Sequence, residues 1–526
     1  MNEILGKIRY EAKLSQEKFA ELIGVSRQAV QKWESGAAFP DLEHLIRISE
    51  KFGVSLDALV FGGGRRVAEE LAFDKKVKPK YAAIHVWESY SSALMHEYRQ
   101  AEDEGKDVAA FKDLFRAASL LPAGEHKEKI ADVLYEMVCE APLRQDYPFD
   151  EPSDLEGIRR TRKGKADRFS PVRPAREKIE GAWTGRICGC LLGKPVEGIS
   201  KEELKFLLKS SGNLPMRRYI LSSDLTEEVR SQLRFRIQEG ALADRAAEAG
   251  CAPADDDTNY TVMAQLLVSR FGIGFTPHDV SRLWLSCQPK DAYCTAERVA
   301  FLNFVNGYEP PDSAVYKNPY REWIGAQIRG DYFGYLYAGD PCRAAEAAWK
   351  DACISHVKNG IYGEMFAAAA VAAAAVSGDV RQIVASAAEQ IPAASRLYAA
   401  LSDVLAWHKA GLSQKACFDK IYARWDDADG YGWTHTIPNA MIVCAALLYG
   451  EGDFARSVCM AVEAGFDTDC NGATVGSVLG MMNGIQGIKK EWTAPLCGTL
   501  DTSVFGVGKV KISDLVDRTM EQMVAK

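Results

Sequence analysis

The chain has 526 residues and a mass of 57.9 kDa, a length that predicts about two to four domains at roughly 150 residues each. A content of 47% hydrophobic and 26% charged residues excludes a disordered or fibrous protein, and the net charge of −8 argues against a chain that coats nucleic acid along its length. The longest apolar run, residues 366–376, is far shorter than the about 20 residues that cross a bilayer, and the first ten residues lack the features of a secretion signal. We therefore expect a cytoplasmic protein with no membrane partner.

The first sixty residues predict a compact module of five short helices. Apolar-periodic segments alternate with turn signals, and Ser15, Ser26 and Asp41 stand where helix N-caps belong. Three consecutive glycines at 62–64 cannot support a regular helix, so we place a domain boundary there. The first predicted domain spans residues 1–62.

The stretch LSQEKFAELIGVSRQAVQKWESG in this module resembles the Cro/repressor type of helix-turn-helix domain. In that family the second of the paired helices enters the major groove of DNA, where arginine suits guanine and glutamine suits adenine. The alternatives are a solvated helix face and a protein-interaction module built on the same scaffold. The resemblance implies DNA contacts by Gln16, Arg27, Gln28, Gln31 and Lys32.

The charge of this module bears on how it would bind DNA. Residues 1–64 hold eight Lys/Arg and nine Asp/Glu, a net charge of −1. Because phosphate contacts supply a large share of DNA affinity, a single copy should bind weakly. We therefore expect a homodimer that binds a palindromic DNA site through residues 1–62.

Residues 63–175 are predicted to form a helical adaptor and connector. Amphipathic helical patterns run from Tyr81 to Glu140, whereas residues 144–174 are rich in proline and charge without periodicity, which is typical of a loop. No pattern in this region indicates chemistry. Helical signals dominate again from residue 176 to residue 526, where we expect the largest domain. The predicted fold class is all-α throughout.

Two series of glycines in the third domain recur at every fourth position, at 181–193 and at 472–484. Each series lines one stripe of a helix. A glycine inside a helix costs about 0.8 to 1 kcal/mol relative to alanine, so another interaction must compensate. We hypothesise that the two helices cross at close range along their bare stripes.

Acidic residues cluster at two helix starts in the same domain. Asp255, Asp256 and Asp257 stand at the first, and Asp467 and Asp469 at the second. The helix dipole stabilises a carboxylate by about 0.3 to 1 kcal/mol, which explains one such residue more readily than three. Exposed caps are the alternative, but two matching clusters favour bound cations, and oxygen ligands select hard ions such as Mg²⁺ or Mn²⁺.

Four blocks spread over residues 178–490 resemble the ADP-ribosylglycohydrolase family: GRICGCLLGKPVEG, ADDDTNYTVMAQLL, SHVKNGIYGEMFAAA and GFDTDCNGATVGSVLG. The resemblance implies an all-α fold whose cleft holds two divalent cations, usually Mg²⁺, that bind the ribose whose glycosidic bond is cleaved. It implies a catalytic Glu197 facing that bond, with a metal-bound aspartate such as Asp257 as the alternative acid/base. The implied metal ligands are Asp255, Asp256, Asp257, Asp467, Asp469 and Cys470.

Three departures from the family pattern concern this centre. Asp255 stands where better-known members have threonine, which adds a negative charge and should hold an ion more tightly. Cys470 replaces a second threonine, and a thiol is a poor ligand for Mg²⁺. The first block also lacks an aspartate that many members carry, in the neighbourhood of Lys194.

The third block and a later segment supply candidate substrate-binding residues. Two histidines sit among small polar residues and could line the adenosine-diphosphate side of the cleft, with the satisfied core histidine as the alternative. Three residues of the third block share this assignment. The predicted set is His356, Asn359, Tyr362, Glu364 and His435.

Together these patterns predict a metal-dependent hydrolase of an ADP-ribosyl or related ribosyl bond, in residues 176–526, fused to a sequence-specific DNA-binding head. Its substrate would be an ADP-ribosylated macromolecule or a ribosyl metabolite. The alternative is a transcription regulator that senses an ADP-ribose-like or nucleoside-like ligand without turnover. A third possibility is an enzyme whose head only dimerises it.

Overall fold

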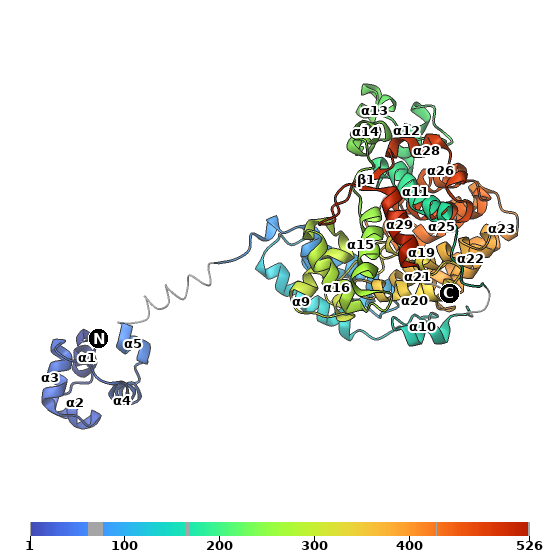
Figure 1. Cartoon of the computed structure of the whole chain (residues 1–526). Coiled ribbons are helices and arrows are strands. Elements are labelled where there is room, and N and C mark those ends of the chain that lie inside the picture. The colour runs from blue at the N-terminus through green and yellow to red at the C-terminus, as the bar shows by residue number, and fades with distance from the viewer. Residues whose placement is uncertain (1, 62–76, 165–168, 428, 524–526) are drawn as a thin grey trace. The chain divides into compact units, whose positions relative to one another are not determined.

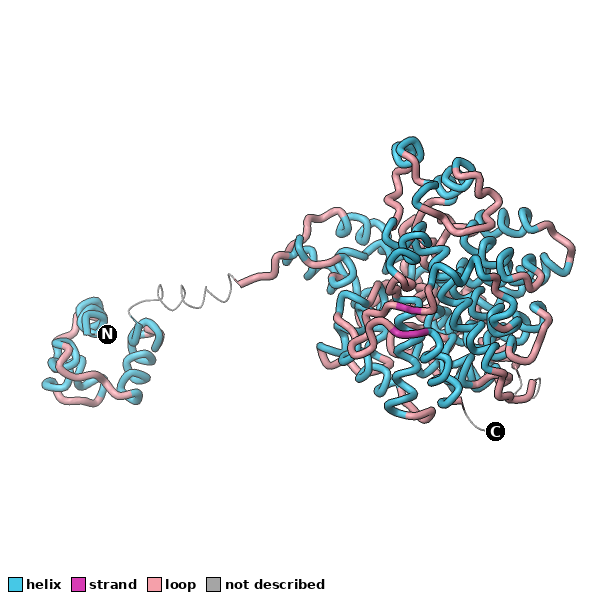
Figure 2. The backbone as a smooth tube through the Cα atoms, turned by 45° about the horizontal axis from the view of Figure 1, so that its top comes forward, coloured by secondary structure: helices cyan, strands magenta, loops and turns pink. Residues whose placement is uncertain are grey.

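The computed structural model describes residues 2–61, 77–164, 169–427 and 429–523. Helices account for most of the described chain, which confirms the all-α class (Figures 1 and 2). The chain divides into two compact units, Met1–Ile84 and His85–Lys526, so most of the predicted adaptor belongs to the larger unit. The boundaries at 62 and 175 stay predictions, and the triple glycine lies outside the described residues.

Within the described residues, the smaller unit, here the head, contains five short α-helices, and the predicted caps lie at helix starts. Ser15 and Ser26 accept hydrogen bonds from the backbone of Lys18 and Ala29, both at 3.2 Å. The core comprises side chains from all five of these helices, including the fully buried Phe19 and Leu59. The helices are α1 (Asn2–Glu11), α2 (Gln16–Ile23), α3 (Arg27–Ser35), α4 (Leu42–Phe52) and α5 (Leu56–Phe61).

The larger unit begins with the adaptor, whose helices are α7 (Leu94–Asp103), α8 (Lys112–Ser119), α9 (Glu125–Glu140) and α10 (Leu155–Thr161). The expected loop at 144–174 therefore contains one helix, α10, whose N-cap Asp154 accepts a hydrogen bond from the backbone of Gly157 at 2.7 Å. The N-cap at Asp154 favours this helix in a segment whose sequence shows no apolar periodicity.

The rest of the larger unit is built from nineteen described helices and one pair of short strands. The strands pair antiparallel, with Thr499 opposite Lys511. In chain order these elements are α11 (Arg176–Gly193), α12 (Lys201–Ser210), α13 (Glu227–Gln232), α14 (Ala243–Ala249), α15 (Asp256–Phe271), α16 (Pro277–Cys287), α17 (Thr295–Val305), α18 (Asp312–Val315), α19 (Asp331–Leu336), α20 (Pro341–Ala352), α21 (Lys358–Ala374), α22 (Val380–Ala388), α23 (Arg396–Lys409), α24 (Gln414–Tyr422), α25 (Thr436–Gly450), α26 (Phe454–Glu463), α27 (Thr468–Asn483), α28 (Lys490–Thr493), β1 (Thr499–Leu500), β2 (Val510–Lys511) and α29 (Ile512–Gln522).

Most of the long apolar run of the sequence, residues 366–374, lies in α21, which is buried on every side apart from its first residue. The neighbouring α25 is likewise buried along its whole length. A helix that is apolar all round belongs in a core, and these two helices with α11 and α27 form the centre of the larger unit. None of the described helices is long and apolar enough to span a membrane.

The two glycine series face each other, which confirms the predicted close crossing. A methyl group on Gly181, Gly185 or Gly189 would overlap the carbonyl oxygen of Gly480, Gly476 or Gly472, respectively, and the reverse substitutions would overlap in the same way. The pairing runs in opposite directions along the two helices. The end of α11 therefore meets the start of α27, where the Thr468 hydroxyl donates a hydrogen bond to the carbonyl oxygen of Gly193 at 2.8 Å.

Candidate active site

The two acidic clusters come together where α11 ends and where α15 and α27 begin. Asp255 is the N-cap of α15 and accepts a hydrogen bond from the backbone of Asp257 at 2.9 Å. Three overlapping groups of side chains have ligand atoms within 4.8 Å of one another. The groups are Cys190, Asp255 and Asp257; Asp257, Asp469 and Cys470; and Glu197, Asp467 and Asp469.

Lys194 lies inside this set of carboxylates, which we call the acidic centre: Glu197, Asp255, Asp256, Asp257, Asp467 and Asp469. Its Nζ is 2.8 Å from Glu197 Oε2, 2.9 Å from Asp255 Oδ2 and 3.3 Å from Asp469 Oδ2. The lysine follows directly after α11, so the glycine crossing carries its side chain into the centre. One ammonium thus contacts carboxylates from three separate segments of the chain.

A second cation, Arg186, supports the centre from behind and was not predicted from the sequence. Its guanidinium is fully buried and lies 3.1 Å from Asp257 Oδ1 and 2.8 Å from Asp331 Oδ2. It also donates to the backbone carbonyl oxygen of Asp257 at 2.7 Å. Arg186 therefore fixes the first turn of α15 against α11.

The electrostatics of the centre show a surplus of negative charge. Burial and the neighbouring carboxylates raise the pKa of Asp256, Asp257 and Asp469, and they raise the pKa of Asp467 to about 7. At Asp255 burial acts in the same direction, but the Lys194 ammonium outweighs it and the pKa is lowered. Lys194 and Arg186 together do not balance six carboxyl groups.

The carboxylates of the centre fit a hard divalent cation. Two buried oxygens, Asp257 Oδ2 and Asp467 Oδ1, accept no hydrogen bond, which is costly unless a cation is bound to them. Burial and the adjacent carboxylates raise the pKa of the Cys190 and Cys470 thiols, and a protonated thiol is a weak ligand. The oxygens, rather than the sulfurs, are therefore the favoured ligands.

A cavity of about 400 Å³ opens beside the centre and is lined by Glu197, Asp256, Asp467 and Cys470. Aromatic side chains form much of its remaining wall, and no lysine or arginine among the described residues lines it. The wall is completed by the adaptor, a contribution that the sequence did not reveal. The aromatic and adaptor residues on this wall are Val86, Trp87, Ser92, His96, Tyr320, Trp323 and Trp433.

Three polar atoms on the aromatic side of this cavity are buried and have no hydrogen-bond partner: His96 Nδ1, Trp323 Nε1 and Thr434 Oγ1. The ring of Trp87 is held under the Arg298 guanidinium, 5.0 Å from the ring centroid. The three unpaired atoms of His96, Trp323 and Thr434 are neutral donors or acceptors, and they suit an uncharged heteroaromatic group.

The predicted substrate-binding residues lie in buried networks, and none of the five lines this cavity. The Asn359 amide donates to Glu151 at 2.8 Å and to Glu322 at 2.9 Å, and the Tyr362 hydroxyl donates to the backbone of Pro152 at 2.6 Å. His356 Nδ1 is 2.9 Å from the Ser355 hydroxyl. The contacts of Asn359 and Tyr362 connect α21 to the adaptor, and the Asn359 amide oxygen also accepts a hydrogen bond from the backbone of Leu397 in α23 at 2.9 Å.

The two remaining residues of that set are buried in the same way. Glu364 faces Arg329 at 3.5 Å, and burial raises the pKa of its carboxyl group. His435 stacks on Trp425, and burial lowers its pKa to about 3, so it is neutral. None of these five residues contacts the cavity, and their role in ligand binding stays a prediction.

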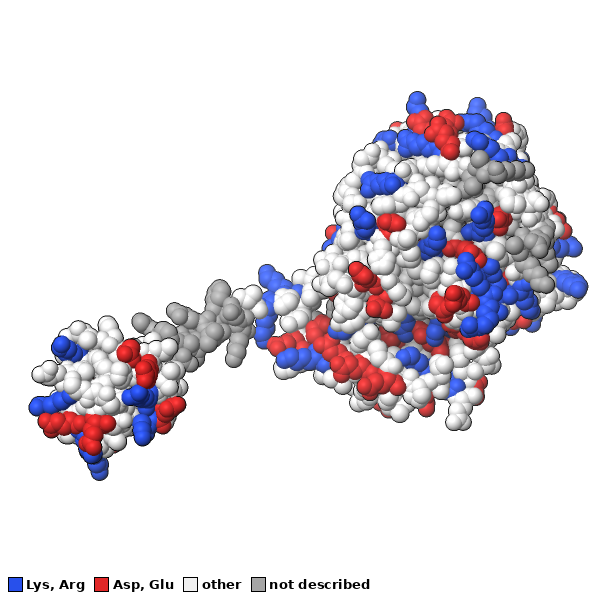
Figure 3. Space-filling view, turned by 60° about the horizontal axis from the view of Figure 1, so that its bottom comes forward, with Lys and Arg blue, Asp and Glu red and all other residues white. Residues whose placement is uncertain are grey.

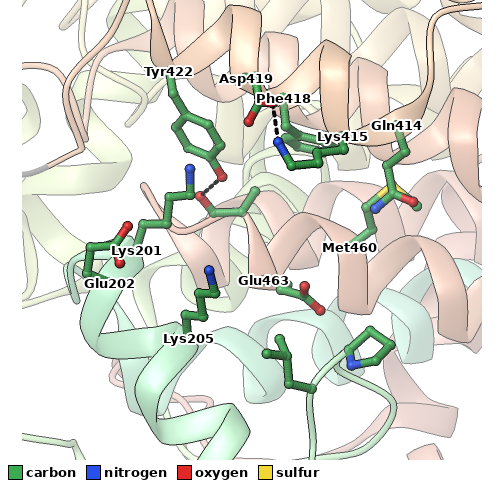
Figure 4. Close-up of a pocket in the computed structure, with 13 residues that line it drawn as sticks. Lys201, Glu202, Lys205, Gln414, Lys415, Phe418, Asp419, Tyr422, Met460 and Glu463 are labelled. Carbon is green, nitrogen blue, oxygen red and sulfur yellow. Dashed lines mark hydrogen bonds and ion pairs between the residues drawn. The ribbon is translucent and has the colours of Figure 1, made fainter.

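A larger surface pocket, of about 570 Å³, lies elsewhere on the unit and contains none of the acidic centre (Figure 4). Two of its lysines are engaged by neighbouring side chains of the same pocket. Lys415 pairs with Asp419 at 2.6 Å, and Lys201 Nζ lies 3.4 Å from the centroid of the Tyr422 ring. Size alone therefore does not identify the candidate site.

In the head, four of the five predicted DNA-binding residues are exposed on α3: Arg27, Gln28, Gln31 and Lys32. Gln16 differs, because its amide donates to Glu34 at 2.8 Å, where Arg9 also binds. Acidic and basic side chains are interspersed on the visible face of the head, in keeping with its near-neutral charge (Figure 3).

An all-α unit with a buried double acidic centre, joined to a helix-turn-helix head, defines the class of this protein. The ADP-ribosylglycohydrolase family model matches residues 172–525, more than half of the chain, and a helix-turn-helix model matches residues 5–59. The chain belongs to the ADP-ribosylglycohydrolase family and carries an N-terminal helix-turn-helix domain.

Curated relatives match the head only. The transcriptional activator BcrR of Enterococcus faecalis is 46% identical over 61 residues, which are 12% of this chain and 30% of that protein. The prophage-derived transcriptional regulator YonR of Bacillus subtilis is 42% identical over 60 residues, which are 11% of this chain and 56% of that protein. The chain thus covers less than two thirds of either relative.

Among solved structures, an ADP-ribosylglycohydrolase-related protein complex matches with a TM-score of 0.42 and 17% identity. The match covers 67% of this chain and 98% of that one.

Proposed function

We propose that residues 176–526 hydrolyse the glycosidic bond of an ADP-ribosyl or related ribosyl compound, with divalent cations held by the acidic centre. The observation that carries the proposal is the convergence of two distant helix starts on one buried set of carboxylates that borders a cavity. Helix capping alone does not explain why the two acidic clusters are paired, because a cap needs neither burial nor a second cluster.

The carboxylates fit Mg²⁺ or Mn²⁺. The proposed ligands Asp257, Asp467 and Asp469, with Asp255 and Cys470 beside them, belong to the groups of converging side chains. Asp256, the remaining proposed ligand, lines the adjoining cavity. When bound, such ions polarise oxygen atoms and orient a water molecule and a vicinal diol. Cleavage of a ribosyl bond develops oxocarbenium character and needs a carboxylate that takes or gives a proton.

Glu197 is the better placed acid/base of the two predicted candidates. Its carboxylate lines the cavity and is oriented by Lys194 at 2.8 Å and by the Gln238 amide at 3.2 Å. Asp257, in contrast, is fully buried against Arg186 and does not line the cavity. We assign proton transfer to Glu197 and cation binding to Asp257.

The aromatic wall bears on the substrate. Because its unpaired polar atoms are neutral and no cationic side chain among the described residues lines it, it favours an uncharged aromatic group over a phosphate. Ribosyl compounds with a heteroaromatic base therefore belong in the first substrate screen, beside ADP-ribosylated peptides.

The test is a turnover screen of both substrate classes with Mg²⁺, with Mn²⁺ and with chelator. Turnover should require the cation, and Asp256→Asn or Asp469→Asn should lower kcat/KM by about 100-fold or more. The matched control is Asp403→Asn, which removes a surface carboxylate paired with Arg424 and should leave the rate unchanged. Wild-type rates in the two centre variants would refute the proposal, whereas binding without turnover would favour the sensor.

We further propose that the head binds DNA through α3. Arg27→Ala combined with Gln28→Ala should weaken binding to a selected operator by about 1–3 kcal/mol per lost base contact, measured by electrophoretic mobility shift. Lys7→Ala, which also removes one exposed positive charge, is the control and should lower affinity for all sequences equally. An unchanged operator affinity in the double variant would leave the head a dimerisation module.

A further inference from the structure

The position of Lys194 raises the question of how many cations the acidic centre can hold. Its ammonium contacts Glu197, Asp255 and Asp469, and each of the three groups of candidate ligands contains at least one of these residues. Its side chain is 18% exposed, so most of it is enclosed by the centre. Lys194 is thus bound where a metal ion would find its ligands.

An ammonium group and a divalent cation compete for such a position. Both need the same carboxylate oxygens, and two positive charges a few ångströms apart repel each other in a site with little water. Withdrawal of the lysine would leave Asp255 and Asp469, 5% and 1% exposed, without their cation. Removing one partner of a buried ion pair is strongly unfavourable.

The backbone fixes the lysine in this position. Gly193 is packed against Thr468 at the end of the glycine crossing, and Pro195 follows on the other side. Lys194 therefore begins between two restrained residues and has only its side-chain rotamers to change.

We propose that the ammonium of Lys194 is a permanent cation of the acidic centre and takes the place of one of the two divalent ions predicted there. The centre then holds a single divalent ion, on the oxygens that Lys194 leaves unpaired, among them Asp257 Oδ2 and Asp467 Oδ1. This inference rests on the proposed metal centre and concerns the stoichiometry of that centre, not its turnover.

The test compares Mn²⁺ binding to the full-length wild-type chain and to Lys194→Met, by isothermal titration calorimetry and by the electron paramagnetic resonance signal of free Mn²⁺. Methionine keeps an unbranched stem of similar length and removes the charge. The expected result is one ion per chain in the wild type and two in the variant. Lys415→Met, which removes a lysine from an exposed pair with Asp419, should bind one ion like the wild type.

Two results would overturn the proposal: two ions per wild-type chain, or equal stoichiometries in the wild type and Lys194→Met. The wild-type measurement alone decides the first of these, even if the variant does not fold. Because no substrate is present, the outcome is separate from that of the turnover screen. A chain that binds one ion and hydrolyses nothing would keep this inference and remove the proposed activity.

Discussion

The surroundings of the acidic centre and the outer face of α3 both carry charged side chains to which we assign a function, but the two regions hold these charges in opposite ways. Arg186 has no exposed surface and is held by Asp257 and Asp331, whereas the Arg27 side chain is 62% exposed and has only Glu17 at 3.3 Å. Charges removed from water depend on a partner, while charges in water can exchange theirs. The centre is therefore organised before any ligand arrives, and the head leaves its side chains available to one.

The largest effect expected from this difference is on stability. Arg186→Met should lower the free energy of unfolding of the larger unit by about 3–5 kcal/mol, because it leaves Asp257 and Asp331 buried without a cation. Arg27→Met should change the stability of the head by about 0–1 kcal/mol. Urea denaturation followed by circular dichroism measures both, and similar losses would contradict the comparison.

The glycine crossing offers a second comparison between the two units. Gly189→Ala should cost about 1–3 kcal/mol, because the added methyl group overlaps the Gly472 carbonyl oxygen and the helices must separate. Gly6→Ala lies in a helix of the head with no other atom within 4 Å of the new methyl group, and should stabilise α1 by up to about 1 kcal/mol. A neutral Gly189→Ala in thermal denaturation would mean that the two backbones are not in contact.

The adaptor wall differs from both regions in that its aromatic side chains bear on ligand affinity rather than on stability. Trp87→Ala should weaken binding of a heteroaromatic ribosyl ligand by about 1–3 kcal/mol, the range for stacking on one aromatic side chain, while the stability of the unit changes little. Calorimetric titration with a nucleoside measures this change. The control is Trp407→Ala, which removes a half-buried tryptophan of α23 outside the cavity. An equal loss of ligand affinity in this variant would mean that Trp87 does not contact the ligand.

The sequence predicted those features of the centre that repeat or cluster. The glycine series indicated the crossing of α11 and α27, and the aspartates at two helix starts indicated where carboxylates would gather. Arg186, Cys190 and Lys194 also recur at every fourth position beside the glycines, a spacing that places them on one side of the helix. That spacing would have predicted the cations that face the clusters.

Other features depend on long-range packing that no local pattern encodes. The wall formed by Trp87 and His96 belongs to a segment without a chemical motif, and it reaches the cavity only because the adaptor packs against the rest of the larger unit. Conversely, Asn359 and Tyr362 occur in a family-like block, yet their polar atoms connect buried segments. A motif identifies residue types, whereas the direction of each side chain follows from the surrounding fold.

The seam between α11 and α27 has a consequence for how this protein can vary. Contacts between main-chain atoms, rather than between side chains, fix the distance between the loop that carries Glu197 and the helix that carries Asp469. Substitutions in the surrounding core can accumulate without altering that distance, since no side chain lies between the two helices along their glycine stripes. The facing glycines of α11 and α27 cannot vary in this way, because even a methyl group added there pushes the two halves of the centre apart.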